Sequence, residues 1–136
     1  MKTKKKIWCC LFSLLWIFVL IFPVMASDIP EIPTERQKPL LVDEAGLLSE
    51  EESSTLINKL EEISQRQENE VAVVTVNSLE GKTAEAYADD YYDYNGYGYG
   101  ENDDGLLLLI SMGEREWAIS TYGYSHTTAF TDAGLE

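Results

Sequence analysis

The chain has 136 residues and a formal net charge of −14 at pH 7. This length is enough for one domain, and an acidic surface repels nucleic acids, so DNA or RNA binding is excluded. The only two cysteines, Cys9 and Cys10, lie in an apolar N-terminal stretch, so the rest of the chain has no disulfide, thiolate metal site or cysteine nucleophile.

Residues 1–26 have the pattern of a targeting segment. Four lysines precede the apolar residues 7–25, and Pro23 and Ala26 mark the exit from that run. The pattern predicts a signal peptide cleaved after Ala26, with a retained N-terminal membrane anchor as the alternative. In both cases the basic end places the rest of the chain outside the cytoplasm, either secreted or anchored at the outer face of the cytoplasmic membrane. Residues 27–136 then carry six basic and 24 acidic side chains, a net charge of −18.

Residues 27–39 contain three prolines and no apolar periodicity, which predicts a linker before a domain of residues 40–136. Ser49 and Glu52 form a capping-box signature, and the apolar stripe that follows predicts a helix over residues 50–66. A run rich in β-branched residues predicts a buried strand over residues 70–76. Thr83 then caps a second predicted helix over residues 84–94.

The apolar run of residues 106–111 is too short for a helix of its own and predicts a strand buried on both faces. A tight turn follows, and residues 116–121 alternate as an antiparallel strand would. Alternation of helices and strands predicts an α/β fold, a three-layer α/β/α sandwich with a mixed, mainly parallel sheet. Residues 127–136 resemble the start of a further helix, so we expect the domain to be truncated at its C-terminal side.

Six tyrosines lie between residues 87 and 99. Those on the predicted second helix are spaced to pack against the sheet, whereas those among Gly96, Gly98 and Gly100 fall in a segment that reads as a flexible loop. Two interpretations stay open for these rings. They form either an aromatic contact surface for a partner or glycan, or half-buried packing with hydrated hydroxyl groups.

The residues that could carry chemistry are acidic. His126 is the only histidine, and no nucleophile elbow, phosphate-binding loop, dinucleotide motif or zinc motif occurs. Glu101, Asn102, Asp103 and Asp104 instead place hard oxygen ligands in one turn, which suits Ca²⁺ or Mg²⁺, although an acidic loop in water explains the same pattern.

The expected topology sorts these carboxylates. With parallel strands over residues 70–76 and 106–111, Asp104 lies at the N-terminal edge of the sheet, and the hairpin returns the chain to that edge near Gly123. We therefore expect Asp103, Asp104 and Asp132 to converge on a metal site and Asp43 to lie at the opposite edge. This placement differs from the usual rule for α/β folds, in which ligands bind beyond the C-terminal ends of the strands.

The order of several motifs resembles the TPM domain family, which includes thylakoid acid phosphatases. The matching segments are Val42–Ser49, Glu70–Val76, Asn102–Leu109, Arg115 and Thr131–Ala133. The resemblance implies an α/β/α sandwich on the far side of a membrane, acid phosphatase activity in plant members and Ca²⁺ binding in some. It implies that Asp103 or Asp104 is the acidic residue before the Gly-Leu-Leu strand and that Asp132 is the later Thr-Asp.

These observations lead to three functional hypotheses. The favoured one is an extracytoplasmic module that binds an unidentified secreted or membrane protein partner, supports assembly or maintenance of a membrane complex, and carries a candidate Ca²⁺ site. The alternative is a metal-assisted acid phosphatase, in which the cation polarises the phosphoryl group and activates water. The third is a structural domain without metal or turnover. No catalytic residue can be assigned from the sequence.

Overall fold

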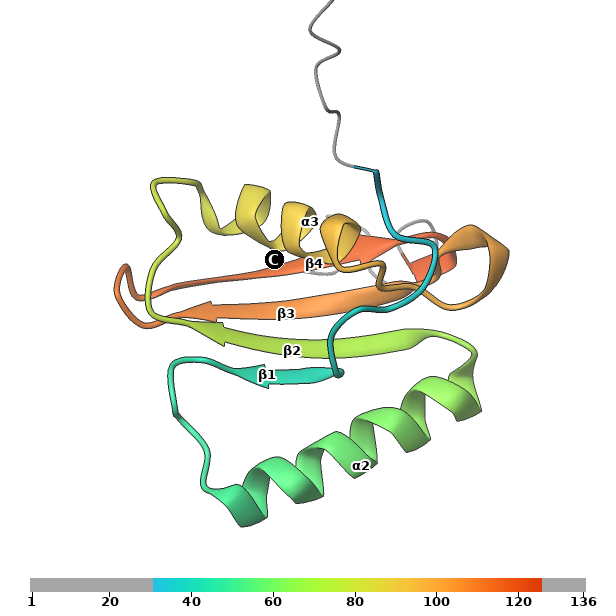
Figure 1. Cartoon of the computed structure of the whole chain (residues 1–136), viewed down its shortest axis with the longest axis horizontal. Coiled ribbons are helices and arrows are strands. Elements are labelled where there is room, and N and C mark those ends of the chain that lie inside the picture. Colours follow the sequence, from blue (N-terminus) through green and yellow to red (C-terminus); the bar gives the residue numbers. More distant parts are fainter. Residues whose placement is uncertain (1–30, 126–136) are drawn as a thin grey trace, which may run out of the picture.

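The computed structural model describes residues 31–125, which form one sheet with a helix on each face (Figure 1). The predicted targeting segment, His126 and Asp132 lie outside the described residues. The elements are β1 (Leu41–Asp43), α2 (Glu50–Gln67), β2 (Glu70–Val76), α3 (Ala84–Tyr94), the 3₁₀ turn η2 (Gly100–Asn102), β3 (Gly105–Ser111) and β4 (Glu116–Tyr122).

The four strands lie in the order β1-β2-β3-β4. The first three are parallel and β4 is antiparallel to β3, so the mixed, mainly parallel sheet predicted from the sequence is confirmed. Helix α2 packs on β1 and β2 on one face, and α3 packs on β3 and β4 on the other (Figure 1). These three layers are the predicted α/β/α sandwich. Strand β1 is not predicted from the sequence, and it is only three residues long.

Both helices begin where their capping residues predict. The Glu52 amide donates to Ser49 Oγ at 3.3 Å and the Ser49 amide donates to Glu52 Oε2 at 2.9 Å, which completes the capping box. At the start of α3, the Ala86 amide donates to Thr83 Oγ1 at 3.2 Å. One otherwise unpaired amide in the first turn of each helix thereby gains a partner. Helix α2 ends at Gln67, one residue beyond the prediction.

The core lies mainly between the sheet and α3. Leu107 and Leu109 of β3 are 0% exposed and point to the same face as Val74 of β2, where Ala88 and Tyr92 of α3 cover them. The alternate residues of β3 are only partly buried. Within the described part of the chain, the prediction that β3 is buried on both faces therefore holds for the α3 face alone.

The described part of the predicted linker, residues 31–39, forms no helix or strand, but it is attached to the domain. The Gln37 amide donates to the Asn95 carbonyl at 2.8 Å, and the Tyr97 hydroxyl donates to the Pro39 carbonyl at 2.8 Å. Gly96 lies so close that a side chain there would stand 2.5 Å from the Glu35 carbonyl oxygen. Between residues 31 and 125, no helix is long and apolar enough to cross a bilayer.

Candidate functional site

The acidic turn before β3 is built around a left-handed residue. Asp103 follows η2 with a φ of 52°, and the Tyr92 hydroxyl of α3 donates to its carbonyl at 3.0 Å. Gly98 lies directly against it, because a Cβ atom at Gly98 would stand 2.6 Å from Asp103 Cα. Gly98 also has a φ of +131°, which only glycine adopts readily. The turn is therefore held in one conformation, with the Asp103 side chain exposed to solvent.

Asp104 joins three parts of the N-terminal edge of the sheet. Its carbonyl accepts from the amides of Glu70 and Tyr99, each at 2.9 Å. Its Oδ1 accepts from the Tyr124 amide, just after β4. A side chain at Gly123 would collide with the same carboxylate, so Gly123 must be small. The expectation that the hairpin returns the chain to Asp104 near Gly123 is thus confirmed.

The predicted metal ligands are placed as follows. Asp103 and Asp104 lie at the N-terminal edge of β3, whereas Asp43 pairs with Thr75 at the C-terminal end of β2, as expected. Asp132 lies outside the described residues, so its convergence with Asp103 and Asp104 stays a prediction. Within residues 31–125, no group of three or more histidine, cysteine, aspartate or glutamate side chains is placed to hold a metal ion. A three-carboxylate site at this edge therefore depends on Asp132.

Asp93 of α3 lies near enough to the turn for the charge of Asp103 to affect its pKa. Burial raises the pKa of Asp93 above its ordinary value, and the charges of Asp89, Asp90 and Asp103 raise it further. The Ser120 hydroxyl of β4 donates to Asp89 Oδ1 at 2.5 Å, which holds one of these carboxylates against the sheet. The acidic side chains near the N-terminal edge of the sheet therefore repel one another.

The opposite edge holds its carboxylates differently. Asp43 accepts from the Leu47 amide at 3.0 Å, the Leu48 amide at 2.8 Å and the Thr75 hydroxyl. The Thr75 hydroxyl bond and the two backbone bonds lower the pKa of Asp43. Here the carboxylate anchors the loop between β1 and α2, because it satisfies backbone donors that would otherwise lack partners.

Glu114 has the same function in the loop between β3 and β4. It accepts from the Ser111 hydroxyl and from the Leu79 amide, at 3.2 Å from each carboxylate oxygen. These hydrogen bonds, led by the one from Ser111, lower the pKa of Glu114. Glu114 is not predicted from the sequence, because nothing in the local pattern shows that Leu79 lies beside it.

Comparison with known proteins identifies the family to which these residues belong. A family model described as the TPM domain matches residues 41–136, which include β1, both helices and the turn with Asp103 and Asp104. The chain belongs to the TPM domain family. The family resemblance predicted from the motifs is thereby confirmed.

Two solved structures are similar to this TPM domain. One is the N-terminal domain of a protein from P. gingivalis, with 29% sequence identity, a TM-score of 0.60, and coverage of 76% of this chain and 67% of that chain. The other is the N-terminal domain of a protein from Corynebacterium glutamicum, with 22% identity, a TM-score of 0.53, and coverage of 76% of this chain and 62% of that chain. The second likeness concerns the fold alone. Among curated proteins, none matches the chain.

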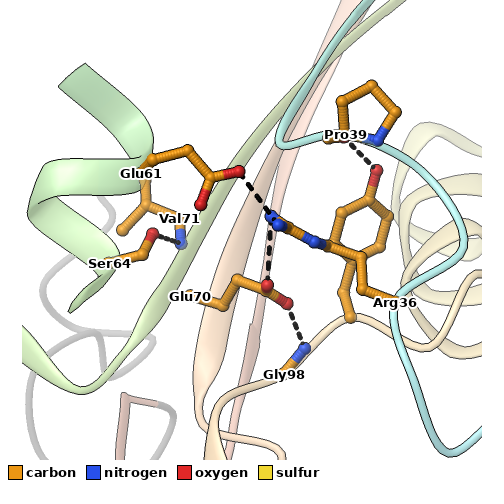
Figure 2. Close-up of polar contacts among 8 residues, drawn as sticks. Arg36, Pro39, Glu61, Ser64, Glu70, Val71 and Gly98 are labelled. Atoms are coloured by element: carbon orange, nitrogen blue, oxygen red, sulfur yellow. Dashed lines mark hydrogen bonds and ion pairs between the residues drawn. The ribbon is translucent and has the colours of Figure 1, made fainter. Parts of the chain in front are cut away.

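The TPM domain also contains an ion-pair cluster that the sequence analysis missed (Figure 2). Arg36 Nη2 lies 2.9 Å from Glu61 Oε1 and Arg36 Nη1 lies 3.3 Å from Glu70 Oε1. The Gly98 amide donates to the other Glu70 oxygen at 2.5 Å. Burial raises the pKa of Glu70, although Gly98 and Arg36 oppose the shift. Because Arg36 comes from the predicted linker, no local pattern could have found this cluster.

The tyrosines of the TPM domain divide between packing and surface. Tyr92 stacks on Tyr122 of β4 with ring centroids 4.1 Å apart, and burial raises its pKa. Tyr97 lies in the predicted loop after α3, but its side chain is buried, at 3% exposed, and its ring packs on Tyr91 with centroids 6.2 Å apart. Tyr94 is exposed beside a shallow hollow on α3, and the prediction of an aromatic contact surface stays open.

Proposed function

We propose that this TPM domain acts outside the cytoplasm as a binding module that supports a membrane complex, with a Ca²⁺ site at the N-terminal edge of its sheet. The observation that carries the proposal is the convergence of Asp103, Asp104 and the Gly123 turn at one edge, beside the carboxylates of α3. Mg²⁺ is the alternative ion.

Electrostatics support a cation at this edge. Burial raises the pKa of Asp93 most, and the neighbouring acidic charges raise it further; a divalent ion would remove that second, repulsive part. Ca²⁺ binds six to eight oxygen ligands in flexible geometry, and carboxylates next to an exposed turn suit it better than the strict octahedron of Mg²⁺. In our proposal Asp103 and Asp104 supply two carboxylates and Asp132 supplies the third.

A direct test is isothermal titration calorimetry with CaCl₂ on the full chain in lipid nanodiscs. We expect a saturable heat for the wild type, a strong loss of affinity for Asp103→Asn and Asp104→Asn, and a similar loss for Asp132→Asn. Glu85→Gln is the matched control, because it removes one exposed carboxylate that lies in the first turn of α3 and is not one of the proposed ligands. Absence of heat in the wild type, or equal affinity in all variants, would overturn the Ca²⁺ site.

The binding module is tested separately from the ion. Reversible cross-linking in membranes of the native host should recover the same membrane protein with the wild type and with Glu85→Gln, and less of it when calcium is chelated. Recovery of no membrane protein in any condition would contradict the module, whatever the calorimetry shows.

The phosphatase alternative uses the same edge. A phosphomonoester dianion is repelled by a domain of this charge, so turnover requires the cation. Hydrolysis of p-nitrophenyl phosphate should then depend on added Ca²⁺ or Mg²⁺ and fall in Asp104→Asn. Equal hydrolysis by the wild type and by Asp104→Asn would exclude this edge as the source of the activity.

A further inference from the structure

Helix α3 presents a stripe of tyrosines beside a shallow hollow. Tyr87, Tyr91 and Tyr94 recur at helical spacing, so they share one side of the helix. The rings of Tyr87 and Tyr91 stack with centroids 6.2 Å apart, and Tyr94 is 49% exposed. Two carboxylates and one lysine also line the hollow. We name as the tyrosine hollow the surface lined by Tyr87, Tyr91, Tyr94, Glu80, Lys82 and Asp90.

A cationic side chain of the protein already lies in the tyrosine hollow. Lys82 Nζ is 5.9 Å from the centroid of the Tyr87 ring and 2.7 Å from Asp90 Oδ2. The face of an aromatic ring attracts a cation at such a distance. The hydrogen bond with Asp90 raises the pKa of Lys82, and the charges of Asp90 and Glu80 also raise it. The rings and carboxylates of the hollow therefore favour a positive group.

The loop between β2 and α3, which forms one wall of the hollow, is held in place from below. The Leu79 amide donates to Glu114, at 3.2 Å from each carboxylate oxygen, and the Leu79 side chain is 1% exposed. The Lys82 amide in turn donates to the Leu79 carbonyl at 3.0 Å. A wall that is ordered before binding lowers the entropic cost of holding a ligand.

Lys82 itself is easily displaced from this position. The side chains of Lys82 and Asp90 are 44% and 43% exposed, and an ion pair open to water in this way contributes little to stability. A guanidinium group stacks flat on an aromatic ring and offers more N–H donors to a carboxylate than an ammonium group does. An arginine from outside therefore fits the same rings and the same carboxylate better than Lys82.

Charge complementarity selects the kind of partner. Residues 27–136 carry a net charge of −18, which attracts a basic segment and repels an acidic one. Sugar rings also stack on tyrosines, but the position of Lys82 between Tyr87 and Asp90 favours a cation over a neutral glycan.

We propose that the tyrosine hollow binds an arginine side chain on a basic segment of a partner protein, in the place that Lys82 occupies in the free domain. Lys82 is then an internal competitor, which turns into solvent when the partner docks. The inference rests on the binding module of the proposed function but not on its Ca²⁺ site, since the hollow uses none of the proposed metal ligands.

The competition by Lys82 provides the first test. The full chain in phosphatidylcholine nanodiscs is titrated with the peptide acetyl-Gly-Arg-Gly-Arg-Gly-amide in EDTA, and the amide signals of Tyr87 and Tyr94 are followed by NMR. We expect saturable shifts for the wild type and several-fold tighter binding for Lys82→Met. Lys59→Met is the matched control, because it removes the same charge from an exposed position on α2, outside the tyrosine hollow, and should leave the affinity unchanged.

Tyr94 tests the aromatic contribution without disturbing the core. Tyr94→Leu should weaken binding of the same peptide several-fold, whereas Tyr94→Phe, which keeps the ring, should bind like the wild type. Far-UV circular dichroism checks that both variants remain folded.

Three outcomes would overturn the inference. The first is an absence of peptide-induced shifts at Tyr87 and Tyr94. The second is weaker or unchanged binding in Lys82→Met, because Lys82 is then no competitor. The third is saturable shifts with tri-N-acetylchitotriose and none with the peptide, which assigns the hollow to a glycan.

Cross-linking in native membranes separates this inference from the binding module. We expect Tyr94→Leu to recover less of the membrane protein that the wild type recovers. Equal recovery by Tyr94→Leu and the wild type would overturn the role of the hollow and leave the module in place.

Discussion

The two edges of the sheet both carry carboxylates, but the C-terminal edge stabilises the ionised form whereas the N-terminal edge destabilises it. At the C-terminal edge, Asp43 and Glu114 accept backbone amides and hydroxyl groups, and these bonds lower their pKa values. At the N-terminal edge, burial and neighbouring acids raise the pKa values of Glu70 and Asp93. The difference teaches that an acidic residue next to a strand has a structural role where donors meet it. Where carboxylates face one another, they can bind a cation.

The largest expected effect is at the C-terminal edge. The Thr75 hydroxyl donates to Asp43 and accepts from the Ala45 amide at 3.2 Å, and Thr75 is 2% exposed. Thr75→Val removes both hydrogen bonds at nearly constant volume, so we expect a loss of about 2 kcal/mol in the free energy of unfolding. Urea denaturation measures it, with Thr75→Ser as the control that retains the hydroxyl. Equal losses in the two variants would show that the hydroxyl does not anchor this edge.

A smaller effect is expected at the N-terminal edge. Arg36→Ala leaves the Glu70 carboxylate, whose side chain is 12% exposed, without its cation, and we expect a loss of about 1 kcal/mol. Glu70→Gln in the same chain should restore most of it, because the glutamine side chain is neutral and its oxygen can still accept from the Gly98 amide. A double-mutant cycle in urea tests this coupling. Additive losses would mean that Arg36 acts through other contacts.

The smallest expected effect is a difference between the two edges in how their carboxylates change stability with pH. The pKa of Asp43 is lowered from 3.8, so its contribution is present above that value and is lost as the pH falls through the folded-state pKa. The pKa of Asp93 is raised from 3.8, so its contribution is present below that value and is lost as the pH rises through the folded-state pKa. At neutral pH, Asp43→Asn should therefore lower the melting temperature and Asp93→Asn should raise it.

Melting curves from acid to neutral pH check this pair of variants. Both differences from the wild type should shrink as the solution is acidified, because the native carboxylates become protonated and resemble the amides. Shifts of the same sign at neutral pH would contradict the comparison between the edges.

Local patterns were sufficient for much of the fold. Ser49, Glu52 and Thr83 mark the helix starts because capping is a contact between residues close in sequence. The parallel strands and the hairpin then placed Asp104 beside Gly123. Contacts between distant residues were not accessible in this way: Arg36 meets Glu61 across 25 positions, and Tyr97 is buried by the chain around Pro39.

Mapping of amide resonances by NMR tests the central claim, a cation at the N-terminal edge, most directly. The account predicts that Ca²⁺ shifts, and Mn²⁺ broadens, the amide signals of Asp103, Asp104 and Tyr124 while those of Leu47, Leu48 and Leu79 stay unchanged. Broadening confined to Leu47, Leu48 and Leu79, or no change at Asp103 and Asp104 at saturating ion, would contradict it.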